Sequence, residues 1–319
     1  MRRRMVLGGL LMVGVLSIAV AAQQQAAPPK PSASAIKVEK LADNLYVLNA
    51  LAAGGGGNTS IFITAAGVVV VDTKNPGWGQ PLLDKIKTIT TKPVTTIINT
   101  HTHGDHVSGN VEFPANVDIV VQENTKANMG AMRPASFVAQ PAGGPPPNIF
   151  TQHNGAGMAK RTFKDTMMIG NGADRIELYY FGRAHTNGDA MVFFPTARVL
   201  HMADVFANKG LPGMDSNNGG TGVGYADTLT KAADFADKNN VVKIVNGHNE
   251  TTTTRAELRE FISYVKDFVT TVQEAKRSGK TVDQVVAAWK TPVKYAGYEA
   301  TSVPVRVKAD AELIFKETK

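Results

Sequence analysis

The chain contains the stretch NTHTHGDHVSGN, which runs from residue 99 to residue 110. His101, His103 and His106 are three of the seven histidines among 319 residues, and Asp105 stands between the last two. For a single histidine, a solvated loop or a hydrogen-bonded side chain would be the ordinary interpretation. Three histidines and a carboxylate within six positions instead favour the binding of metal ions.

The residues before this stretch predict how its side chains are presented. Residues 94–100 are apolar and β-branched, which is typical of a central strand. His101 and His103 follow two residues apart, and such residues point to the same side of extended backbone, so both imidazoles can reach one ion. Gly104 allows a turn, after which the aspartate and the third histidine face a second position. Sites in α/β sheets tend to form where strands end, as this one does.

Strand-like and helix-like segments alternate along the chain. Short β-rich runs predict strands, and runs with apolar residues on one helical face predict helices. The interleaving indicates an α/β domain in which helices cover the sheet faces. The expected strands are 45–48, 60–64, 68–72, 94–100, 117–122, 176–181, 190–194, 199–203 and 241–246, and the expected helices are 81–89, 226–239, 254–279 and 282–289.

Three further candidate ligands each follow a β-rich run. His185 lies in a glycine-flanked turn between two expected strands, Asp204 ends the segment VLHMAD, and His248 ends the segment VNGH. Taken alone, each is as consistent with an ordinary turn residue as with a ligand. Because all three follow strands, they can converge with the histidine cluster on one edge of the sheet.

The complete pattern resembles the metallo-β-lactamase superfamily, whose signature is H-x-H-x-D-H followed by a lone His, a lone Asp and a final His. The resemblance spans residues 36–250 and implies a four-layer αββα sandwich with metal ions on one edge of two packed sheets. It also implies the distribution of ligands: His101, His103 and His185 on the first ion, Asp105, His106 and His248 on the second, and Asp204 bridging both.

Such ligands suit two zinc ions, although manganese or iron would also fit. Zinc lowers the pKa of a bound water to about 7, so a metal-bridging hydroxide is the expected nucleophile. One ion would polarise a carbonyl oxygen, and Asp105 would act as the catalytic residue that orients the hydroxide and passes on its proton. The expected function is hydrolysis of an ester, lactone or amide bond in a small molecule, with β-lactams among the candidates.

The sequence departs from the β-lactamases that have a cysteine ligand. Asp204 stands where they carry that cysteine, and Ala207 stands where they carry a substrate-binding lysine. Lys209 and Asn187 are the candidate substrate-binding residues here. The alternatives to the general hydrolase are a β-lactamase proper, a non-catalytic periplasmic metal-binding accessory protein, and a mononuclear iron dioxygenase with open coordination positions.

Several other polar residues are expected to support the site or the fold. Asp72 and Asp189 end or flank strands near the cluster, and ligating histidines usually donate their second N–H to such a carboxylate. Turn formation is the competing interpretation for both. His201 lies on the strand leading to Asp204, where packing or a surface position is expected rather than ligation, and His153 is expected to be solvated.

Two loops could border the site. Residues 130–157 are rich in Ala, Gly and Pro and are long enough to form a lid or a wall. Residues 219–225, with the sequence GGTGVGY, could line the pocket. Phosphate binding by this second loop is disfavoured because it lacks the lysine and the strand-then-helix context of a P-loop.

The N-terminus has the pattern of an export signal. Three arginines precede an apolar run and an Ala-Val-Ala cleavage site, which predicts a signal peptide over residues 1–22. A transmembrane anchor is disfavoured because the run is short for a span. Residues 23–35 predict a flexible leader, and residues 36–319 a single metallo-β-lactamase-like domain with C-terminal helices. The mature protein is expected to be periplasmic or secreted, with no stable membrane anchor.

Charge and cysteine content narrow the function classes further. Loss of the three arginines would leave 31 basic against 27 acidic residues, so the net charge of +7 would become +4. This mild balance, without a basic run, argues against nucleic acid as a partner. The chain has no cysteine, which excludes disulfides, thiolate metal ligands and a cysteine nucleophile.

Overall fold

The computed structural model describes residues 30–139, 142–299 and 303–319. The expected signal peptide and the first part of the expected leader lie outside these residues. The described end of the leader contains a short 3-10 helix, η1 (Ala33–Ala35), just before the first strand. Across the three described ranges, no helix combines the length and the apolar character that crossing a bilayer requires.

The first sheet has seven strands within the described residues: β1 (Lys37–Ala42), β2 (Leu45–Asn49), β3 (Thr59–Ile63), β4 (Val68–Val71), β5 (Val94–Ile98), β6 (Asp118–Gln122) and β7 (Arg161–Phe163). They keep chain order across the sheet. β1 to β4 form an antiparallel meander, and β4 to β7 are parallel. All four valines of β4 are buried, as expected for a central strand covered on both faces.

The second sheet has five strands in the described part of the chain: β8 (Thr166–Ile169), β9 (Ile176–Tyr179), β10 (Met191–Phe194), β11 (Val199–Ala203) and β12 (Lys243–Asn246). Their order is β12-β11-β10-β9-β8. β11 and β12 are parallel, and the other neighbours are antiparallel. Every residue of β10 and β11 is buried, which explains the apolar runs that predicted them.

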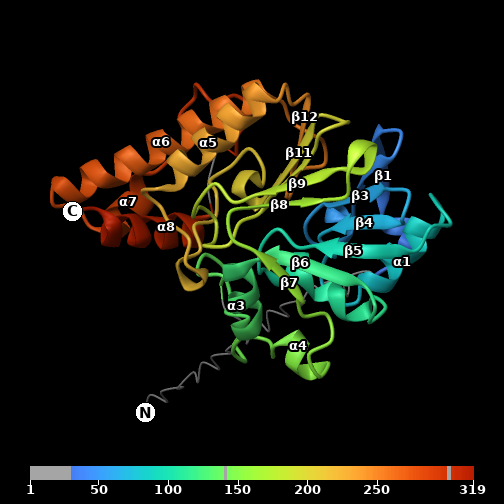
Figure 1. Ribbon diagram of the computed structural model, residues 1–319. Helices are drawn as coiled ribbons and strands as arrows, with labels where there is room; N and C mark the ends of the chain where they lie inside the picture. The colour runs from blue at the N-terminus through green and yellow to red at the C-terminus, as the bar shows by residue number, and fades with distance from the viewer. Residues whose placement is uncertain (1–29, 140–141, 300–302) are drawn as a thin grey trace, which may run out of the picture.

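Helices cover the outer faces of both sheets (Figure 1). α1 (Gly79–Lys87) and α3 (Glu123–Ala131) lie against the first sheet; α5 (Tyr225–Lys238), α6 (Arg255–Arg277), α7 (Val282–Ala288) and α8 (Pro304–Glu317) lie on the side of the second. α6 begins at a capping box formed by Thr254 and Glu257. The short helices are α2 (Gly104–Val107), α4 (Ile149–Gln152), η2 (Leu51–Ala53), η3 (Ser108–Glu112), η4 (Gly172–Asp174), η5 (Asp204–Phe206) and η6 (Ser216–Asn218).

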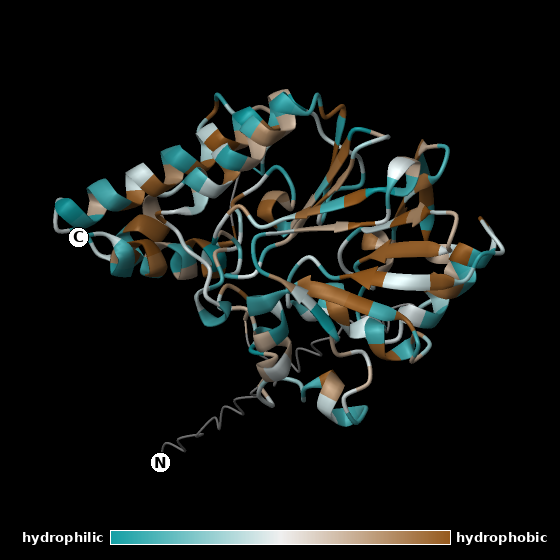
Figure 2. Ribbon diagram, viewed as in Figure 1, coloured by the Kyte–Doolittle hydropathy of each residue, from teal (hydrophilic) through white to brown (hydrophobic). Residues whose placement is uncertain are grey.

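Three clusters of buried apolar side chains, counted over the described residues, fill the spaces between layers. The central cluster lies between the sheets and includes Phe62, Ile98, Phe194 and Val245. A second joins the first sheet to α1 and α3, and a third joins the second sheet to α5, α6 and α8. Figure 2 shows the hydrophobic residues concentrated in the strands. The helix–sheet–sheet–helix order is the αββα sandwich that was predicted.

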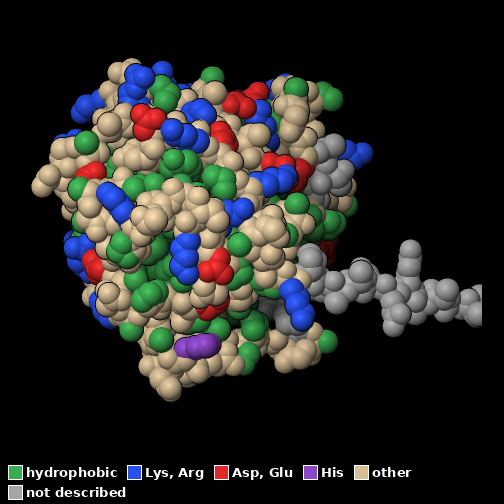
Figure 3. Space-filling view, turned by 90° about the vertical axis from the view of Figure 1, so that its right-hand side faces the viewer, with side chains coloured by type: hydrophobic (Ala, Val, Ile, Leu, Met, Phe, Trp, Pro, Cys, Tyr) green, Lys and Arg blue, Asp and Glu red, His purple; other side chains and the backbone are tan. Residues whose placement is uncertain are grey.

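The outer surface mixes charges of both signs. Figure 3 shows Lys and Arg side chains interspersed with Asp and Glu over the face that lies at the right of Figure 1. Ion pairs such as Lys40–Asp43 on this part of the fold are exposed, so each contributes little to stability. The stability of the fold therefore depends mainly on the three buried clusters.

His201 lies between the two sheets, which confirms its expected packing role. Its side chain is fully buried, and Nδ1 lies 2.8 Å from Oγ of Ser60 on β3. Its Nε2 has no hydrogen-bond partner within the described residues. Burial lowers the pKa of His201 to about 4, although Asp72 opposes the shift. The folded protein therefore holds this imidazole in its neutral form at neutral pH.

We expect His201 to make the fold sensitive to acid. An unfolded histidine has a pKa of about 6.5, so the unfolded chain binds the extra proton as the pH falls from 6.5 to 4. The stabilisation present above pH 6.5 is then lost, by about 3 kcal/mol in total. Urea unfolding with chelator present should show the stability difference between wild type and His201→Leu changing by this amount between pH 7 and pH 4. A pH-independent difference would contradict the assignment.

Candidate metal centre

The first group of candidate ligands forms where β5 of the first sheet meets loops of the second sheet. His101 and His103 follow β5, His185 lies between β9 and β10, and Asp204 follows β11. Nδ1 of His103 lies 3.1 Å from Nε2 of His101 and 2.9 Å from Nε2 of His185. Oδ2 of Asp204 lies 3.6 Å from Nε2 of His185. The donor atoms of these four buried residues all lie within 4.8 Å of one another.

A second group lies beside the first and also draws on both sheets. Asp105 and His106 belong to α2, just after β5, and His248 follows β12. Nε2 of His248 lies 3.4 Å from Nε2 of His106 and 3.2 Å from Oδ2 of Asp105. Gly104 is the first residue of α2, so the turn that re-aims these side chains occurs where the sequence predicted it.

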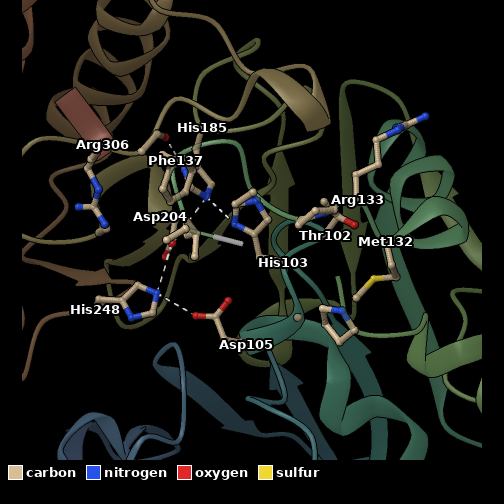
Figure 4. Close-up of a pocket in the computed structure, with 18 of the residues that line it drawn as sticks. Thr102, His103, Asp105, Met132, Arg133, Phe137, His185, Asp204, His248 and Arg306 are labelled. Carbon is tan, nitrogen blue, oxygen red and sulfur yellow. Dashed lines mark hydrogen bonds and ion pairs between the residues drawn. The ribbon is translucent and has the colours of Figure 1, made fainter. Parts of the chain in front are cut away.

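Asp204 joins the two groups (Figure 4). Its Oδ2 lies 3.3 Å from Nε2 of His248, and its Oδ1 lies 3.3 Å from Nε2 of His106. The same carboxylate contacts His185 of the first group. The structure thus brings together all seven residues that the sequence singled out, with Asp204 in the bridging place.

The outward nitrogens of four histidines have partners that fix each ring. Nδ1 of His106 lies 2.8 Å from Oδ2 of Asp72, and Nε2 of His103 lies 2.7 Å from Oδ2 of Asp215. The other two pairs are His185 Nδ1 with the Gly213 carbonyl and His101 Nδ1 with the Thr100 hydroxyl. An outward N–H that is donated to an acceptor leaves the lone pair of the other nitrogen directed into the site, as in metal-ligating histidines.

Electrostatics also fit cation binding. Burial, with His103 adding to it, lowers the pKa of His185 to about 4, and burial lowers the pKa of His101 well below its usual value. Both are therefore neutral, the form in which imidazole binds a metal. Burial opposes protonation of His248, but Asp204 and Asp105 raise its pKa to about 10. These carboxylates increase the affinity of the site for positive charge.

One carboxylate oxygen of Asp204 also indicates that the site fits a divalent cation. Oδ1 of Asp204 is buried and accepts no well-aligned hydrogen bond within the described residues, and its one close polar neighbour is Nε2 of His106 at 3.3 Å. A buried carboxylate oxygen without a partner is costly, and a divalent cation would remove that cost. Imidazole nitrogens and carboxylate oxygens gathered in one place form a donor set that suits divalent metal ions. The residues present therefore fit the metal pair that the resemblance implies.

Local backbone features hold Asp204 in place. The pairing of β11 with β12 shifts register between His201 and Ala203, a bulge of the kind that re-aims side chains near active sites. Ala203 has φ of 44°, a strained value for a residue with a Cβ. Gly247 lies directly against the Asp204 carboxylate, where any side chain would overlap it.

A buried lysine supports the second group and was missed by the sequence analysis. Lys74 is fully buried, and its ammonium donates to the Gly57 carbonyl at 2.8 Å. Gly57 packs flat against the His106 ring, where a Cβ would lie 2.2 Å from Cε1. Burial lowers the pKa of Lys74 to about 7, although Asp72 opposes this. The DTK sequence after β4 could have indicated a polar residue near the cluster, but not this contact.

Asp72 and Asp189, the two residues expected to accept the second N–H of a ligand histidine, have different hydrogen-bond partners. Asp72 accepts from His106 and also from the backbone and hydroxyl of Thr100. Asp189 instead accepts from the backbone N–H and hydroxyl of Thr186. No contact with a ligand histidine is present for Asp189 in the described chain, so turn formation was the better interpretation. Asp215, which the sequence analysis missed, has the role expected of Asp189.

A cavity of about 460 Å³ opens beside the candidate ligands. Asp105, His185, Asp204 and His248 form part of its lining, and Asp105 is accessible from it. The segment after α3 contributes much of the remaining lining, so the loop that was expected to border the site does so. Those residues are Met132, Arg133, Pro134, Ala135, Phe137, Val138, Ala139 and Pro146.

Three sequence candidates lie away from this cavity. Lys209 pairs with Glu257 of α6 at 3.0 Å and does not line it; the neighbouring Asn208 does. The Asn187 side chain accepts from Asn128 of α3 at 2.8 Å and also lies outside the lining. Neither Lys209 nor Asn187 therefore borders the cavity in which a substrate was expected to meet them. His153 is exposed at the end of α4, as expected.

The donors of the glycine-rich loop 219–225 are already hydrogen-bonded to another part of the protein. Oε2 of Glu317 on α8 accepts from the backbone N–H groups of Gly222 and Val223 at 2.9 Å each. It also accepts from the Thr221 hydroxyl at 3.0 Å. A carboxylate thus takes the donors that a phosphate would need, which agrees with the low expectation of phosphate binding.

We expect Asp215→Asn to lower metal affinity by about 10- to 100-fold. The amide retains an acceptor for the His103 N–H but loses the charge that makes the imidazole more basic. Zinc titration of the metal-depleted protein would measure the change. Asp237→Asn on the surface of α5 is the matched control and should bind metal like wild type. Equal affinities for all three proteins would refute the role of Asp215.

Comparison with known proteins identifies the family. The family model described as the metallo-beta-lactamase superfamily matches residues 53–248. The metallo-beta-lactamase type 2 of Elizabethkingia meningoseptica is 27% identical over 228 residues, covering 67% of this chain and 79% of that protein. The 2,4-dinitroanisole O-demethylase subunit alpha of Nocardioides sp. (strain JS1661) is 28% identical over 141 residues, 43% of this chain and 38% of that protein.

Solved structures share the fold at lower identity. A metallo-beta-lactamase from Pontibacter korlensis superposes with a TM-score of 0.55 and 19% identity, covering 72% of this chain and 99% of that one. A double mutant of a sec-alkyl sulfatase has a TM-score of 0.66 and 13% identity, and covers 87% of this chain and 50% of that one. The family model spans both ligand groups and more than half of the chain. The chain therefore belongs to the metallo-beta-lactamase superfamily and is a metal-dependent hydrolase.

Proposed function

We propose that the protein binds two zinc ions and hydrolyses an ester, lactone or amide bond in a small molecule. The observation that carries the proposal is the position of Asp204, whose carboxylate contacts His185 of the first group and both histidines of the second. Such sharing favours two ions over one. A mononuclear iron site would need only the first group and leaves the second unexplained.

The ligand histidines and Asp105 have different roles in the proposed reaction. The histidines hold the ions, and bound ions would supply both an activated water and an electrophile for the carbonyl oxygen. Asp105 has 29% of its side chain exposed and borders the cavity, so it is placed to accept a proton from the attacking water. Burial opposes ionisation of Asp105, but His106 and His248 hold its pKa below the usual range, so it is available as a base.

β-Lactam hydrolysis is the second candidate. The Elizabethkingia relative, whose name describes a metallo-beta-lactamase, favours it. Against it, the position of the β-lactamase lysine is Ala207, and the nearby Lys209 pairs with Glu257 away from the cavity. We therefore place β-lactams behind simple esters and lactones.

Metal analysis and substrate turnover test the proposal together. The purified chain should contain two zinc ions and hydrolyse a simple lactone or aryl ester faster than a chromogenic cephalosporin. Faster cephalosporin turnover would make it a β-lactamase. One iron per chain, or a full metal complement with no turnover of any hydrolysable substrate, would overturn the proposed reaction.

We also propose that the protein is exported. The support is the arginine-led apolar segment and the Ala-Val-Ala site within residues 1–22. N-terminal sequencing of the protein recovered from a periplasmic or culture fraction should begin near residue 23. Recovery of the uncleaved chain from the cytosolic fraction would contradict export.

A further inference from the structure

Arg306 brings a positive charge to the cavity from outside the family region. It belongs to the first turn of α8, whereas the matching region ends at residue 248. Asp204, His248 and Asn208 line the same cavity. Figure 4 shows the guanidinium extending toward the cavity on the side of Asp204 and His248, whereas Arg133 points away from the ligands. α8 thus adds an arginine to a site whose ligands all come from earlier elements.

The guanidinium has spare hydrogen-bonding capacity. Nη1 donates to the Leu211 carbonyl at 3.1 Å, but Nε is buried with no partner among the described residues. An arginine has five N–H donors, and a buried unpaired donor is costly. No carboxylate of the described chain lies within 4.0 Å to form an ion pair with Arg306. The buried Nε is not accessible to a ligand, but the guanidinium has no carboxylate partner, and its terminal N–H groups that Leu211 does not use can donate to an acceptor supplied by a ligand.

The nearest acidic group on α8 does not neutralise this charge. Asp310 lies one turn further along and is fully buried, with Oδ1 accepting from the Met214 N–H at 2.9 Å. Burial raises the pKa of Asp310 well above its usual value, against the opposing effect of Arg306. Burial therefore disfavours the charged form of Asp310, and no ion pair within 4.0 Å joins it to Arg306 among the described residues.

Phe137 connects Arg306 to the metal centre. Cζ of Arg306 lies 5.5 Å from the centre of the Phe137 ring. The same ring lies 5.9 Å from the His103 ring and 5.6 Å from the His185 ring. Stacking of a guanidinium on an aromatic ring restricts its position and prepares it to bind a planar anion. The remaining wall is largely apolar and includes Met132, Val138 and Pro146.

We propose that Arg306 binds an oxyanion group, a carboxylate or a sulfonate-type group, on an amphipathic substrate. The apolar segment of this substrate would lie along Met132 and Phe137, and its scissile bond would face Asp105 and Asp204. Arg306 forms a charge-assisted, bidentate contact that neutral substrates cannot provide. The proposal names the substrate class of the hydrolase proposed above, and so it rests on that function for its biological meaning.

A binding measurement tests Arg306 without requiring turnover. Calorimetric titration of the purified full chain would compare hexanoate, hexane-1-sulfonate and the neutral hexanamide. We expect at least one anion to bind about tenfold more tightly than the amide, and Arg306→Gln to remove that advantage. The anion that shows the larger advantage identifies the group that the site prefers. Equal binding of both anions by wild type and Arg306→Gln would overturn the proposal.

Two further variants keep the test interpretable. Lys308→Gln removes one charge from the same helix, but Lys308 is exposed and pairs with Asp283, so its anion binding should match wild type. Arg306→Lys keeps the charge but loses the fork, and we expect intermediate affinity. If Arg306→Gln fails to fold, the lysine variant decides: wild-type affinity for both anions would contradict the bidentate contact.

A substrate pair extends the test to the reaction. The glutarate monoester and the pentanoate ester of p-nitrophenol have acyl chains of similar length, and only the first ends in a carboxylate. Arg306→Gln should lower kcat/KM for the glutarate ester about tenfold more than for the pentanoate ester. Loss of anion preference in Arg306→Gln binding, without turnover of either ester by wild type, would uphold the anion site and refute the ester-hydrolysing form of the proposed function. An unchanged ratio in an active enzyme would refute Arg306 as the selecting residue.

Discussion

Replacing Asp204 by asparagine is expected to remove at least one metal ion per chain and to lower activity by about 1000-fold. Bound metal ions contribute several kilocalories per mole to such reactions, and each 1.36 kcal/mol corresponds to a factor of ten. Asp204 is the carboxylate shared by both groups, with contacts of 3.3 Å to His106 and to His248. An amide has nearly the same shape but cannot bridge two cations as an anion.

The fold itself should survive this change, because asparagine nearly preserves the volume of the buried side chain. Elemental analysis and kcat/KM measure the effect, and circular dichroism checks the fold. Asp43→Asn is the matched control, since Asp43 is exposed and pairs only with Lys40 among the ion pairs found in the described chain. Full metal content and activity in Asp204→Asn would refute the assignment of the bridging ligand.

Gly247→Ala should damage the same centre without altering any ligand. An alanine Cβ at this position would lie 1.8 Å from Oδ1 of Asp204 and 2.9 Å from the carbonyl carbon of Ala203. Neither neighbour is the far end of a flexible chain, so the carboxylate has to move. A misplacement of about 1 Å near reacting groups can cost about 100-fold in rate. We also expect a loss of about 1–3 kcal/mol in stability from the added methyl group.

Gly130→Ala is the matched control for this substitution. Gly130 lies in α3, and a Cβ there would meet nothing within 4 Å. Alanine is a better helix former than glycine, so this variant should keep full activity and gain up to about 1 kcal/mol in stability. Metal content and kcat/KM, measured for both variants, test whether Gly247→Ala alone damages the metal centre. Wild-type values in Gly247→Ala would show that Asp204 tolerates displacement and is not the shared ligand.

The elements that the sequence predicted are those with strong local patterns. β4 and β10 are wholly apolar and β11 is apolar except for His201, because both faces of these strands are buried. β1 was missed because none of its six residues is buried, so it carries no alternating pattern. α3 was missed for a similar reason, since its apolar residues do not define one face. The local hydrophobic pattern reflects burial, so a strand or helix that buries few apolar residues has little pattern from which it can be predicted.

The site shows the same division between local and long-range information. The positions of His101, His103 and Asp105 follow from a strand and a turn that the sequence makes visible. Asp215 pairs with His103 across 112 positions of chain, and no pattern around it indicates that contact. Arg306 reaches the cavity only because α8 packs back toward the ligands. The residue types could be chosen from sequence, but the partners depend on how distant loops meet.

The candidates that the structure placed elsewhere were chosen for type and proximity in sequence. Lys209 follows Asp204 by five positions, yet the intervening η5 turns it toward Glu257. Asp189 flanks β10, but it stands three positions after Thr186, a spacing that suits capping of the turn. Side-chain direction after a short 3-10 turn or within a loop is set by backbone angles that periodicity does not report.

Each ligand group takes side chains from both sheets, so a bound ion would fasten the two halves of the molecule together. His103 and His185 meet across 82 positions of chain, and joining points so far apart restricts the unfolded chain strongly. Proteins often place a disulfide in such a position, but this chain has no cysteine. The metal link between the two sheets would therefore not respond to oxidants or reductants. Chelators would break it, and so would acid that protonates the imidazoles.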